Sequence, residues 1–107
     1  MMDDATKERI VGLTKSNRVV LFMKGNKMFP QCGFSAHVLG ILKQAGVDFD
    51  AHNILSDPEL RQGLKELSNW PTYPQLYVDG KLVGGCDIIT DMHESGELNQ
   101  LLEGGAH

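Results

Sequence analysis

Apolar residues recur along this chain with two different periods, which predicts an alternation of helices and strands. Spacings of three and four residues predict helices at 5–17, 33–45, 56–69 and from 87 onward, with an interruption at Gly96. Continuous or alternating apolar runs predict strands at 19–23, 47–54, 75–78 and 81–83. The predicted order of elements is therefore αβαβαββαα.

The connections between the predicted strands indicate how the sheet is built. A strand, a helix and a second strand in sequence favour a parallel pair joined by a right-handed crossover. Asp79-Gly80 lies between the last two strands, and this dipeptide favours a tight antiparallel hairpin. We therefore expect residues 1–107 to form one α/β domain with a mixed four-stranded sheet flanked by helices. Its ordered core should span about residues 5–103, with a short flexible tail at 104–107.

Side chains near 56 and 70 predict the two ends of the third helix. Ser56 and Glu59 have the spacing of a capping box. Leu55 and Leu60 stand where a hydrophobic staple would place them. The segment WPTYP at 70–74 ends the helix, because two prolines within four residues cannot continue it.

The charge balance restricts the classes of function. The chain has 10 Lys and Arg residues against 14 Asp and Glu residues, a net charge of -4. Binding to nucleic acid or to an anionic membrane depends on a surplus of basic side chains, so we expect neither partner. The sequence has no apolar run of transmembrane length and no signal-peptide pattern. We expect a cytoplasmic protein or a mature organellar domain.

The basic residues are unevenly distributed along the chain. Lys24 and Lys27 precede Cys32, and Arg61 and Lys65 lie four residues apart on a predicted helix. If the fold brings these side chains together, they form one cationic site suited to a small anion. The alternative is that all four are solvated surface charges, and the sequence alone favours neither interpretation.

Cys32 lies between a predicted strand and a predicted helix, in the segment FPQCGFSAHV at 29–38. Unpaired N–H groups at a helix N-terminus stabilise a thiolate, and the nearby Lys24 adds to this effect. The flanking proline and glycine indicate an exposed loop. We therefore interpret Cys32 as a reactive thiolate; the alternative is an inert, buried cysteine.

Four separated motifs closely resemble the monothiol glutaredoxins of CGFS type: KG at 24–25, CGFS at 32–35, WPTYP at 70–74 and GGCD at 84–87. The resemblance covers nearly the whole chain, from the first helix to about Leu102. It implies the thioredoxin fold, glutathione binding, and a [2Fe–2S] cluster bridging two protomers of a protein that is monomeric in its apo form. It also implies BolA-like partners and apo iron–sulfur proteins as clients.

The same resemblance assigns roles to the basic residues. Lys24 would meet the Cys32 thiolate or a glutathione carboxylate; otherwise it is a lysine snorkelling at the end of a strand. Arg61 would pair with the glycine carboxylate of glutathione, for which a guanidinium has a suitable geometry. Lys65, one turn further along the helix, is either a third cation of the site or simply solvated.

The remaining glutathione contacts implied by the resemblance come from two loops. Thr72-Tyr73-Pro74 looks like the family's cis-proline loop, in which the backbone of Tyr73 would pair with the cysteine moiety of glutathione. Gly84 and Gly85 would allow close approach, so that the N–H groups of Cys86 and Asp87 hold the γ-glutamyl carboxylate. The Asp87 side chain would bind the γ-glutamyl ammonium, cap the helix, or do both.

Ser35 stands where a dithiol enzyme has its second cysteine, and it cannot resolve a mixed disulfide. Its hydroxyl can donate a hydrogen bond to the thiolate. One hypothesis is a cluster carrier, in which the Cys32 residues of two protomers and two glutathiones supply four thiolates. The other is a monothiol oxidoreductase, in which a second glutathione or Cys86 completes the exchange. Cys86 is thus either a resolving cysteine or a small pocket-lining residue.

Other candidate residues are assigned to packing. We expect Phe34 to pack beside the site and Trp70 to lie in the core. His37, His52, His93 and His107 lack metal-ligand spacing with either cysteine, so no zinc site is expected. His37 follows Cys32 by more than one helical turn and should point away from it, which disfavours a hydrolytic Cys–His pair.

Overall fold

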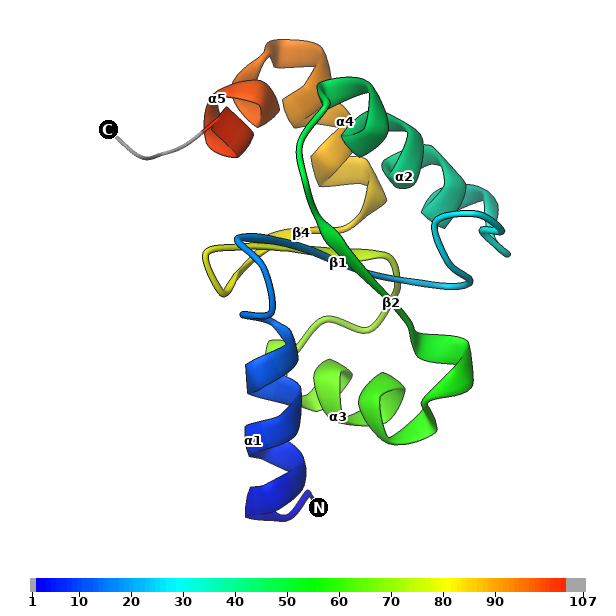
Figure 1. The fold of residues 1–107 in the computed structure, drawn as a ribbon, viewed down its shortest axis with the longest axis vertical. Coiled ribbons are helices and arrows are strands. Elements are labelled where there is room, and N and C mark those ends of the chain that lie inside the picture. Colours follow the sequence, from blue (N-terminus) through cyan, green and yellow to red (C-terminus); the bar gives the residue numbers. More distant parts are fainter. Residues whose placement is uncertain (1, 104–107) are drawn as a thin grey trace.

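The computed structural model describes residues 2–103, and Figure 1 shows their arrangement. The helices are α1 (Asp4–Leu13), α2 (Gly33–Ala45), α3 (Pro58–Ser68), α4 (Cys86–Ser95) and α5 (Glu97–Glu103), with a short 3₁₀ helix, η1 (Ile54–Ser56). The strands are β1 (Val19–Met23), β2 (Asp50–Asn53), β3 (Gln75–Val78) and β4 (Lys81–Gly84). The predicted order αβαβαββαα is confirmed, with η1 as an additional turn before α3. The predicted flexible tail at 104–107 lies outside the described residues.

The four strands form one mixed sheet in the order β2-β1-β3-β4. β1 is parallel to β2, with Met23 opposite Asn53, and β3 is antiparallel to both β1 and β4. Asp79 and Gly80 both have positive φ at the turn between β3 and β4, as a two-residue hairpin requires. The predicted sheet and the predicted hairpin are both confirmed.

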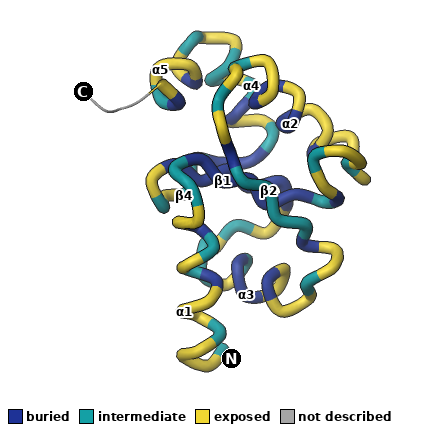
Figure 2. Tube along the Cα trace, viewed as in Figure 1, coloured by how far each residue is buried: buried dark blue, intermediate teal, exposed yellow. Residues whose placement is uncertain are grey.

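The sheet separates two apolar layers (Figures 1 and 2). α1 and α3 cover one face, and α2, α4 and α5 cover the other. β1 lies inside the sheet, and all five of its residues are buried. Its side chains alternate between the layers: Leu21 packs with α2, α4 and α5, whereas Phe22 packs with Ile10 of α1 and Leu64 of α3. A strand covered on both faces has a continuous apolar sequence, which is why VVLFM predicts β1 correctly.

α3 does not begin with the predicted capping box. Asp57 is the N-cap residue, and its Oδ1 accepts a hydrogen bond from the Leu60 N–H at 3.1 Å, with Pro58 in the first turn. The Asp57 carboxylate also accepts from Arg9 of α1 at 3.0 Å. This bond is the main reason why the pKa of Asp57 is lowered. An aspartate cap followed by proline is a strong helix start, and it displaces the weaker signal at Ser56.

Ser56 and Leu55 instead belong to η1. The Ser56 hydroxyl donates to the Asn53 carbonyl at 3.1 Å, and the Leu55 side chain is 39% exposed. The predicted Ser56–Glu59 capping box and the predicted hydrophobic staple are therefore wrong.

Two other elements are shorter than predicted. α1 ends at Leu13, and the Thr14 hydroxyl donates to the Val11 carbonyl there. β2 contains only the four residues that pair with β1. Val47 and Phe49 continue the apolar alternation because they pack against the layer formed with α2, not because they belong to the sheet.

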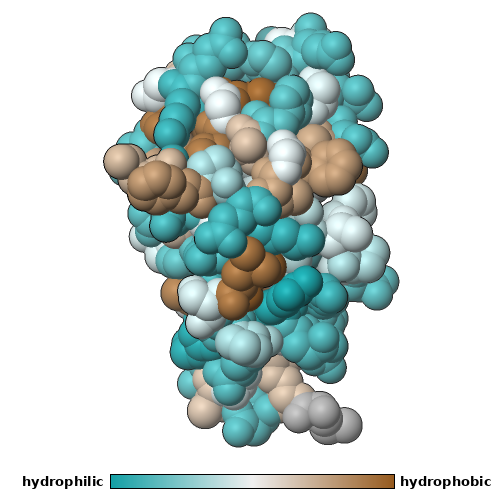
Figure 3. Space-filling model, turned by 90° about the vertical axis from the view of Figure 1, so that its right-hand side faces the viewer, coloured by the Kyte–Doolittle hydropathy of each residue, from teal (hydrophilic) through white to brown (hydrophobic). Residues whose placement is uncertain are grey.

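Apolar side chains are also found on the surface. Figure 3 shows brown and tan patches among hydrophilic ones on the side of the molecule that faces right in Figure 1. The most exposed large apolar residues are Met28, Phe29 and Phe34, at 78%, 70% and 63%. They flank Cys32 in sequence. None of the helices between residues 2 and 103 is both long and apolar enough to cross a membrane.

Candidate functional site

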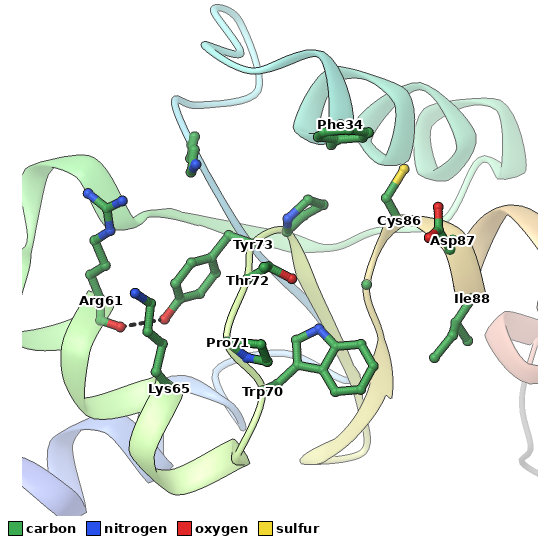
Figure 4. Close-up of a pocket in the computed structure, with 13 residues that line it drawn as sticks. Phe34, Arg61, Lys65, Trp70, Pro71, Thr72, Tyr73, Cys86, Asp87 and Ile88 are labelled. Carbon is green, nitrogen blue, oxygen red and sulfur yellow. Dashed lines mark hydrogen bonds between the residues drawn. The ribbon is translucent and has the colours of Figure 1, made fainter.

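A cavity of about 500 Å³ opens between α3, the loop before β3 and the start of α4 (Figure 4). Its lining comprises Lys24, Phe34, Arg61, Lys65, Trp70, Pro71, Thr72, Tyr73, Pro74, Gly85, Cys86, Asp87 and Ile88. The set contains the residues to which the resemblance assigns contacts with glutathione, except Gly84 at the end of β4. Cys32 is not in the set, but it lies two residues before Phe34, at the beginning of α2. The fold therefore brings distant motifs together around one opening.

Cys32 is the N-cap residue of α2, with an extended backbone, and its side chain is partly exposed. The Ser35 amide, and less strongly the Phe34 amide and the Lys24 ammonium, lower the pKa of the Cys32 thiol; partial burial opposes them. A side chain at an N-cap lies where the second and third amides of the helix converge, so the position itself explains the effect. The Cys32 sulfur is therefore partly exposed, and the start of α2 favours its thiolate form.

Ser35 has a structural task in addition to replacing a second cysteine. It is fully buried, and its hydroxyl oxygen accepts a hydrogen bond from the Lys24 N–H at 3.0 Å. The Ser35 side chain also makes a small contribution to lowering the pKa of Cys32. The hydroxyl that accepts from Lys24 still has a proton to donate, so Ser35 can serve both the backbone of Lys24 and the Cys32 thiolate.

The loop between β1 and α2 closes tightly on Gly25. Gly25 is buried and has φ +96°, and a Cβ atom at this position would overlap the Phe29 carbonyl and the backbone of Pro30 and Gln31. The Gln31 N–H donates to the Lys24 carbonyl at 2.9 Å. Only glycine fits this closure, which fixes the residue immediately before Cys32 against the end of β1.

Three of the four basic residues face the cavity. Lys24, Arg61 and Lys65 line it, and the salt bridges within residues 2–103 involve none of them. Lys27 is different: its ammonium donates to the Phe49 carbonyl and lies 4.1 Å from the centre of the Phe49 ring. The cationic site therefore consists of three side chains rather than four.

The loop before β3 is held by a residue that the sequence analysis missed. The Tyr73–Pro74 peptide bond is cis, as expected for this loop. Fully buried Gln75 donates from Nε2 to the Trp70 and Thr72 carbonyls at 3.2 and 3.3 Å. A glutamine in a strand whose residues are all buried was the available signal, since a buried polar group must find partners.

Tyr73 anchors the same loop to α3. Its hydroxyl donates to the Arg61 carbonyl at 2.8 Å, as Figure 4 shows. Burial raises the pKa of Tyr73, so the phenol keeps its proton. The side chain thus points toward α3 and links the loop to that helix.

α4 begins at the other side of the cavity. Gly85 is its N-cap residue and has no side chain with which to cap the first N–H groups. A Cβ atom on Gly85 would lie 3.1 Å from Trp70 Nε1 and 3.2 Å from the Pro74 carbonyl oxygen. Figure 4 shows the Cys86 sulfur directed toward the N-terminal turn of α2 and the Asp87 carboxylate near it. The free amides of this turn remain available to an anion.

Two aromatic residues differ from their predicted roles. Trp70 is half-buried and lines the cavity, so its assignment to the core is wrong. Its Nε1 atom is buried against Gly85 and has no hydrogen-bond partner among the described residues. Phe34 lies beside the site as expected. Its side chain is exposed and lines the cavity instead of packing in the protein interior. The backbone carbonyl of Trp70 accepts a hydrogen bond from buried Gln75, so the loop that carries the indole is fixed at this point.

His37 makes a contact between two helices. His37 Nε2 lies 3.0 Å from Thr90 Oγ1 on α4, and the Thr90 hydroxyl donates to the Cys86 carbonyl at 2.7 Å. His37 therefore connects α2 to α4. Residues 2–103 contain no group of three or more His, Cys, Asp or Glu side chains suited to one metal ion; His107 lies outside this range.

These features define a class of protein: a thioredoxin-like fold with an accessible thiolate at the start of the helix that follows β1, next to a cis-proline loop and a cationic cavity. Comparison with known families narrows the class. Residues 19–83 match the Glutaredoxin family, and the chain belongs to this family. The resemblance seen in the motifs is thereby confirmed.

Relatives and solved structures agree with this assignment. The chain is 51% identical over 102 residues to a Synechocystis protein named "Uncharacterized monothiol glutaredoxin ycf64-like", covering 95% of each. Some plant relatives are longer, and the chain spans only 20% to 57% of them. The reduced apo form of poplar GrxS14 is 54% identical, with a TM-score of 0.79 over 91% of this chain and 89% of that one. The holo form of poplar glutaredoxin C1 is 28% identical, with a TM-score of 0.84 over 94% and 88%.

Proposed function

We propose that this protein is a glutathione-dependent carrier of [2Fe–2S] clusters. The observation that carries the proposal is a partly exposed thiol with a lowered pKa, Cys32, next to a cavity lined by three basic side chains that form no salt bridge within residues 2–103. One thiol cannot complete a cluster that needs four thiolate ligands. The missing ligands must come from outside the chain, and the cavity is suited to an anionic tripeptide that carries a thiol.

The cavity offers a complementary group to each charged part of glutathione. Arg61 and Lys65 on α3 suit the glycine carboxylate, and Lys24 suits either that carboxylate or the thiolate. The backbone of Tyr73, in the loop Thr72-Tyr73-Pro74, pairs with the cysteine moiety in the manner of an added strand.

The start of α4 takes the γ-glutamyl group. Gly85 permits close approach, and the N–H groups of Cys86 and Asp87 receive the γ-glutamyl carboxylate. The Asp87 carboxylate, which forms no salt bridge within residues 2–103, binds the γ-glutamyl ammonium.

The residues present fit a cluster shared between two protomers. Within residues 2–103 no group of three or more His, Cys, Asp or Glu side chains could hold a metal ion. The proposed ligands of the cluster are therefore two Cys32 thiolates and two glutathione thiolates. The exposed Met28, Phe29 and Phe34 beside Cys32 provide apolar surface for a second protomer. A relative in the same fold has been solved in a holo form. We propose a monomeric apo form and a cluster-bridged dimer.

Such a carrier would deliver its cargo to apo iron–sulfur proteins and pair with BolA-like proteins. Cargo held partly by exchangeable glutathione can be transferred, because two of its four ligands are not covalently part of the protein. Free thiols require a reducing compartment, and we propose the cytoplasm.

The proposal is tested by anaerobic reconstitution with iron, sulfide and glutathione, followed by absorption spectra and native mass measurement. A coloured dimer with one cluster and two glutathiones is expected. It should disappear with Cys32→Ser and when glutathione is omitted, whereas Cys86→Ser should still form it. A colourless monomer under all conditions would contradict the carrier function.

A second function is a monothiol oxidoreductase, favoured by the lowered pKa of Cys32. The Cys32 thiolate would attack the glutathione sulfur of a mixed disulfide, releasing the client thiolate and forming a Cys32–glutathione disulfide. A second glutathione thiolate would attack that glutathione sulfur, giving oxidised glutathione and restoring Cys32. Rapid turnover of a glutathionylated disulfide without any cluster would support this function.

Cys86 provides an alternative route for the second step. Its sulfur points toward α2, so attack on the Cys32 sulfur would release glutathione and leave a Cys32–Cys86 disulfide. Mass measurement after mild oxidation with oxidised glutathione distinguishes the routes. An adduct of one glutathione indicates resolution by a second glutathione, and a loss of the mass of two hydrogen atoms, with oxidised glutathione reduced to two glutathiones, indicates the internal disulfide.

A further inference from the structure

Asn53 is a half-buried residue that lies outside the cavity and outside every motif named above. It ends β2 opposite Met23 and caps η1, the turn that leads into α3. Its side-chain Oδ1 accepts two backbone hydrogen bonds, from Gly25 at 3.0 Å and from Leu55 at 2.9 Å. One amide oxygen therefore joins the loop before Cys32 to the segment before α3.

The two N–H groups that follow β1 are each held by a side chain from a different element. The Lys24 N–H donates to Ser35 of α2, and the Gly25 N–H donates to Asn53 of β2. The Lys24 carbonyl accepts from Gln31, so the loop is closed on itself as well. The backbone of Lys24 is thus fixed on three sides, and Asn53 supplies the only one of these bonds that leads toward α3.

This arrangement bears on the distance between two basic side chains of the cavity, Lys24 and Arg61. Lys24 enters the cavity from the end of β1, and Arg61 enters it from the first turns of α3. These two elements do not share a strand or a helix. The Asn53 oxygen bridges them through Gly25 on one side and the turn η1 on the other. We infer that Asn53 is a positioning residue, which holds Lys24 at the distance from Arg61 that the proposed glutathione site requires.

The chemistry of Asn53 suggests a discriminating pair of variants. Within the described residues, hydrogen bonds of its side chain involve Oδ1, and none involves Nδ2. Asn53→Asp keeps the acceptor and the shape, whereas Asn53→Leu keeps the approximate volume and removes the acceptor. A role in holding the two N–H groups predicts that aspartate retains the loop structure and leucine does not.

The first measurement is amide hydrogen exchange by NMR, at a temperature where circular dichroism shows every variant folded. In Asn53→Leu, the Gly25 and Gln31 amides should exchange about tenfold faster than in the unchanged protein, the factor that corresponds to one lost hydrogen bond. Amides remote from the loop, such as Ile89 in α4, should keep their rates. Asn53→Asp should keep the rates of all three. Equal exchange of Gly25 in the leucine variant and in the unchanged protein overturns the inference.

The second measurement separates positioning from general stability. Glutathione affinity by calorimetry should fall about tenfold in Asn53→Leu, since a displaced Lys24 no longer meets the ligand with Arg61. The pH midpoint for alkylation of Cys32 should change little, because the amides of α2 are its main cause. A variant that merely loosened the fold would move both quantities.

Asn17 provides a matched control at the opposite end of β1. Its side chain donates to Asp48 and Asp50 near the start of β2, at 3.0 and 3.4 Å. Asn17→Leu therefore removes comparable bonds beside the same strand, and glutathione affinity should stay unchanged. An equal loss of affinity in both leucine variants overturns the inference. Failure of the unchanged protein to bind glutathione would contradict the proposed function, and the exchange rates would still decide whether Asn53 holds the loop.

Discussion

α2 and α4 both begin beside the cavity, and each has a cysteine at its start, but the two helix ends are built differently. Cys32 is the N-cap residue of α2, so its own sulfur lies where the first free amides point. Cys86 is the first residue inside α4, and the N-cap is Gly85, which has no side chain. One residue of displacement decides whether the helix end is occupied by its own thiol or left open to a ligand.

The difference between the helix ends has a chemical consequence. Amides that converge on the Cys32 sulfur favour its thiolate, because they stabilise negative charge at that atom. The first amides of α4 have no side-chain cap and belong to residues that line the cavity, where they are suited to an external carboxylate. Under the proposed function, the protein would use one physical device twice, once to favour its own thiolate and once to hold a ligand.

The largest effect expected is the contrast between the two cysteine substitutions. Cys32→Ser should abolish both cluster-dimer formation and thiol exchange, because the only thiol that α2 activates is lost. Cys86→Ser should retain the cluster dimer, since the backbone of α4 rather than its sulfur serves the site. Both variants are compared by anaerobic reconstitution and native mass measurement. Loss of the dimer in Cys86→Ser would show that the helix ends are not as different as the structure indicates.

A methyl group added to each helix start should also give opposite results. In Gly85→Ala the new Cβ lies 3.1 Å from Trp70 Nε1 and 3.2 Å from the Pro74 carbonyl. Moving this turn aside should cost about 1–2 kcal/mol of stability and weaken glutathione binding about tenfold. Gly33→Ala in α2 meets nothing within 4 Å, so stability should be equal or higher by up to about 1 kcal/mol. Urea unfolding and calorimetry measure both quantities, and equal results for the two variants would contradict the comparison.

Motifs and patterns in the sequence predicted most of the fold and most of the cavity lining. The apolar run of β1, the helical spacing at 33–45 and the Asp79-Gly80 turn are local signals, and the structure contains all three features. The start of α3 was predicted at the weaker of two neighbouring local signals. Asp57, followed by Pro58, caps the helix in place of Ser56, and Asp57 also binds Arg9 of α1, a contact separated by 48 residues.

Residues that hold loops through side-chain bonds to the backbone were missed, although the polar Gln75 in an apolar strand was a signal for one of them. Gln75 and Asn53 hold loops that carry site residues, but neither belongs to a motif. Trp70 was assigned to the core because burial is the usual fate of a tryptophan, and the structure places it at the cavity instead. The roles of residues such as Gln75 and Asn53 become clear only in the folded structure, where the loops that they hold lie next to each other.

A smaller effect is expected at the contact that joins the two helices. His37 of α2 and Thr90 of α4 are 3.0 Å apart, and Thr90 also donates to the Cys86 carbonyl. His37→Ala should lower the free energy of unfolding by about 0.5–1 kcal/mol, since an exposed hydrogen bond is lost. Glutathione binding should weaken only about twofold to threefold. An affinity loss as large as that of Gly85→Ala would mean that the two helix ends are more strongly coupled than one contact explains.

The smallest expected effect is a dependence of stability on pH that belongs to α2 alone. The pKa of Cys32 is lower in the folded chain than in the unfolded chain. The thiolate therefore contributes stability that is fully present above the unfolded thiol pKa of about 8.5 and is lost as pH falls through the folded pKa. In a Cys86→Ser background, the difference in unfolding free energy between Cys32 and Cys32→Ser should grow as pH rises through this interval. Urea unfolding at a series of pH values measures it. Because solvent reaches the sulfur, the change in unfolding free energy should be modest. Its sign is nevertheless fixed. A difference that stays flat or shrinks with rising pH would show that the amides of α2 do not stabilise the thiolate.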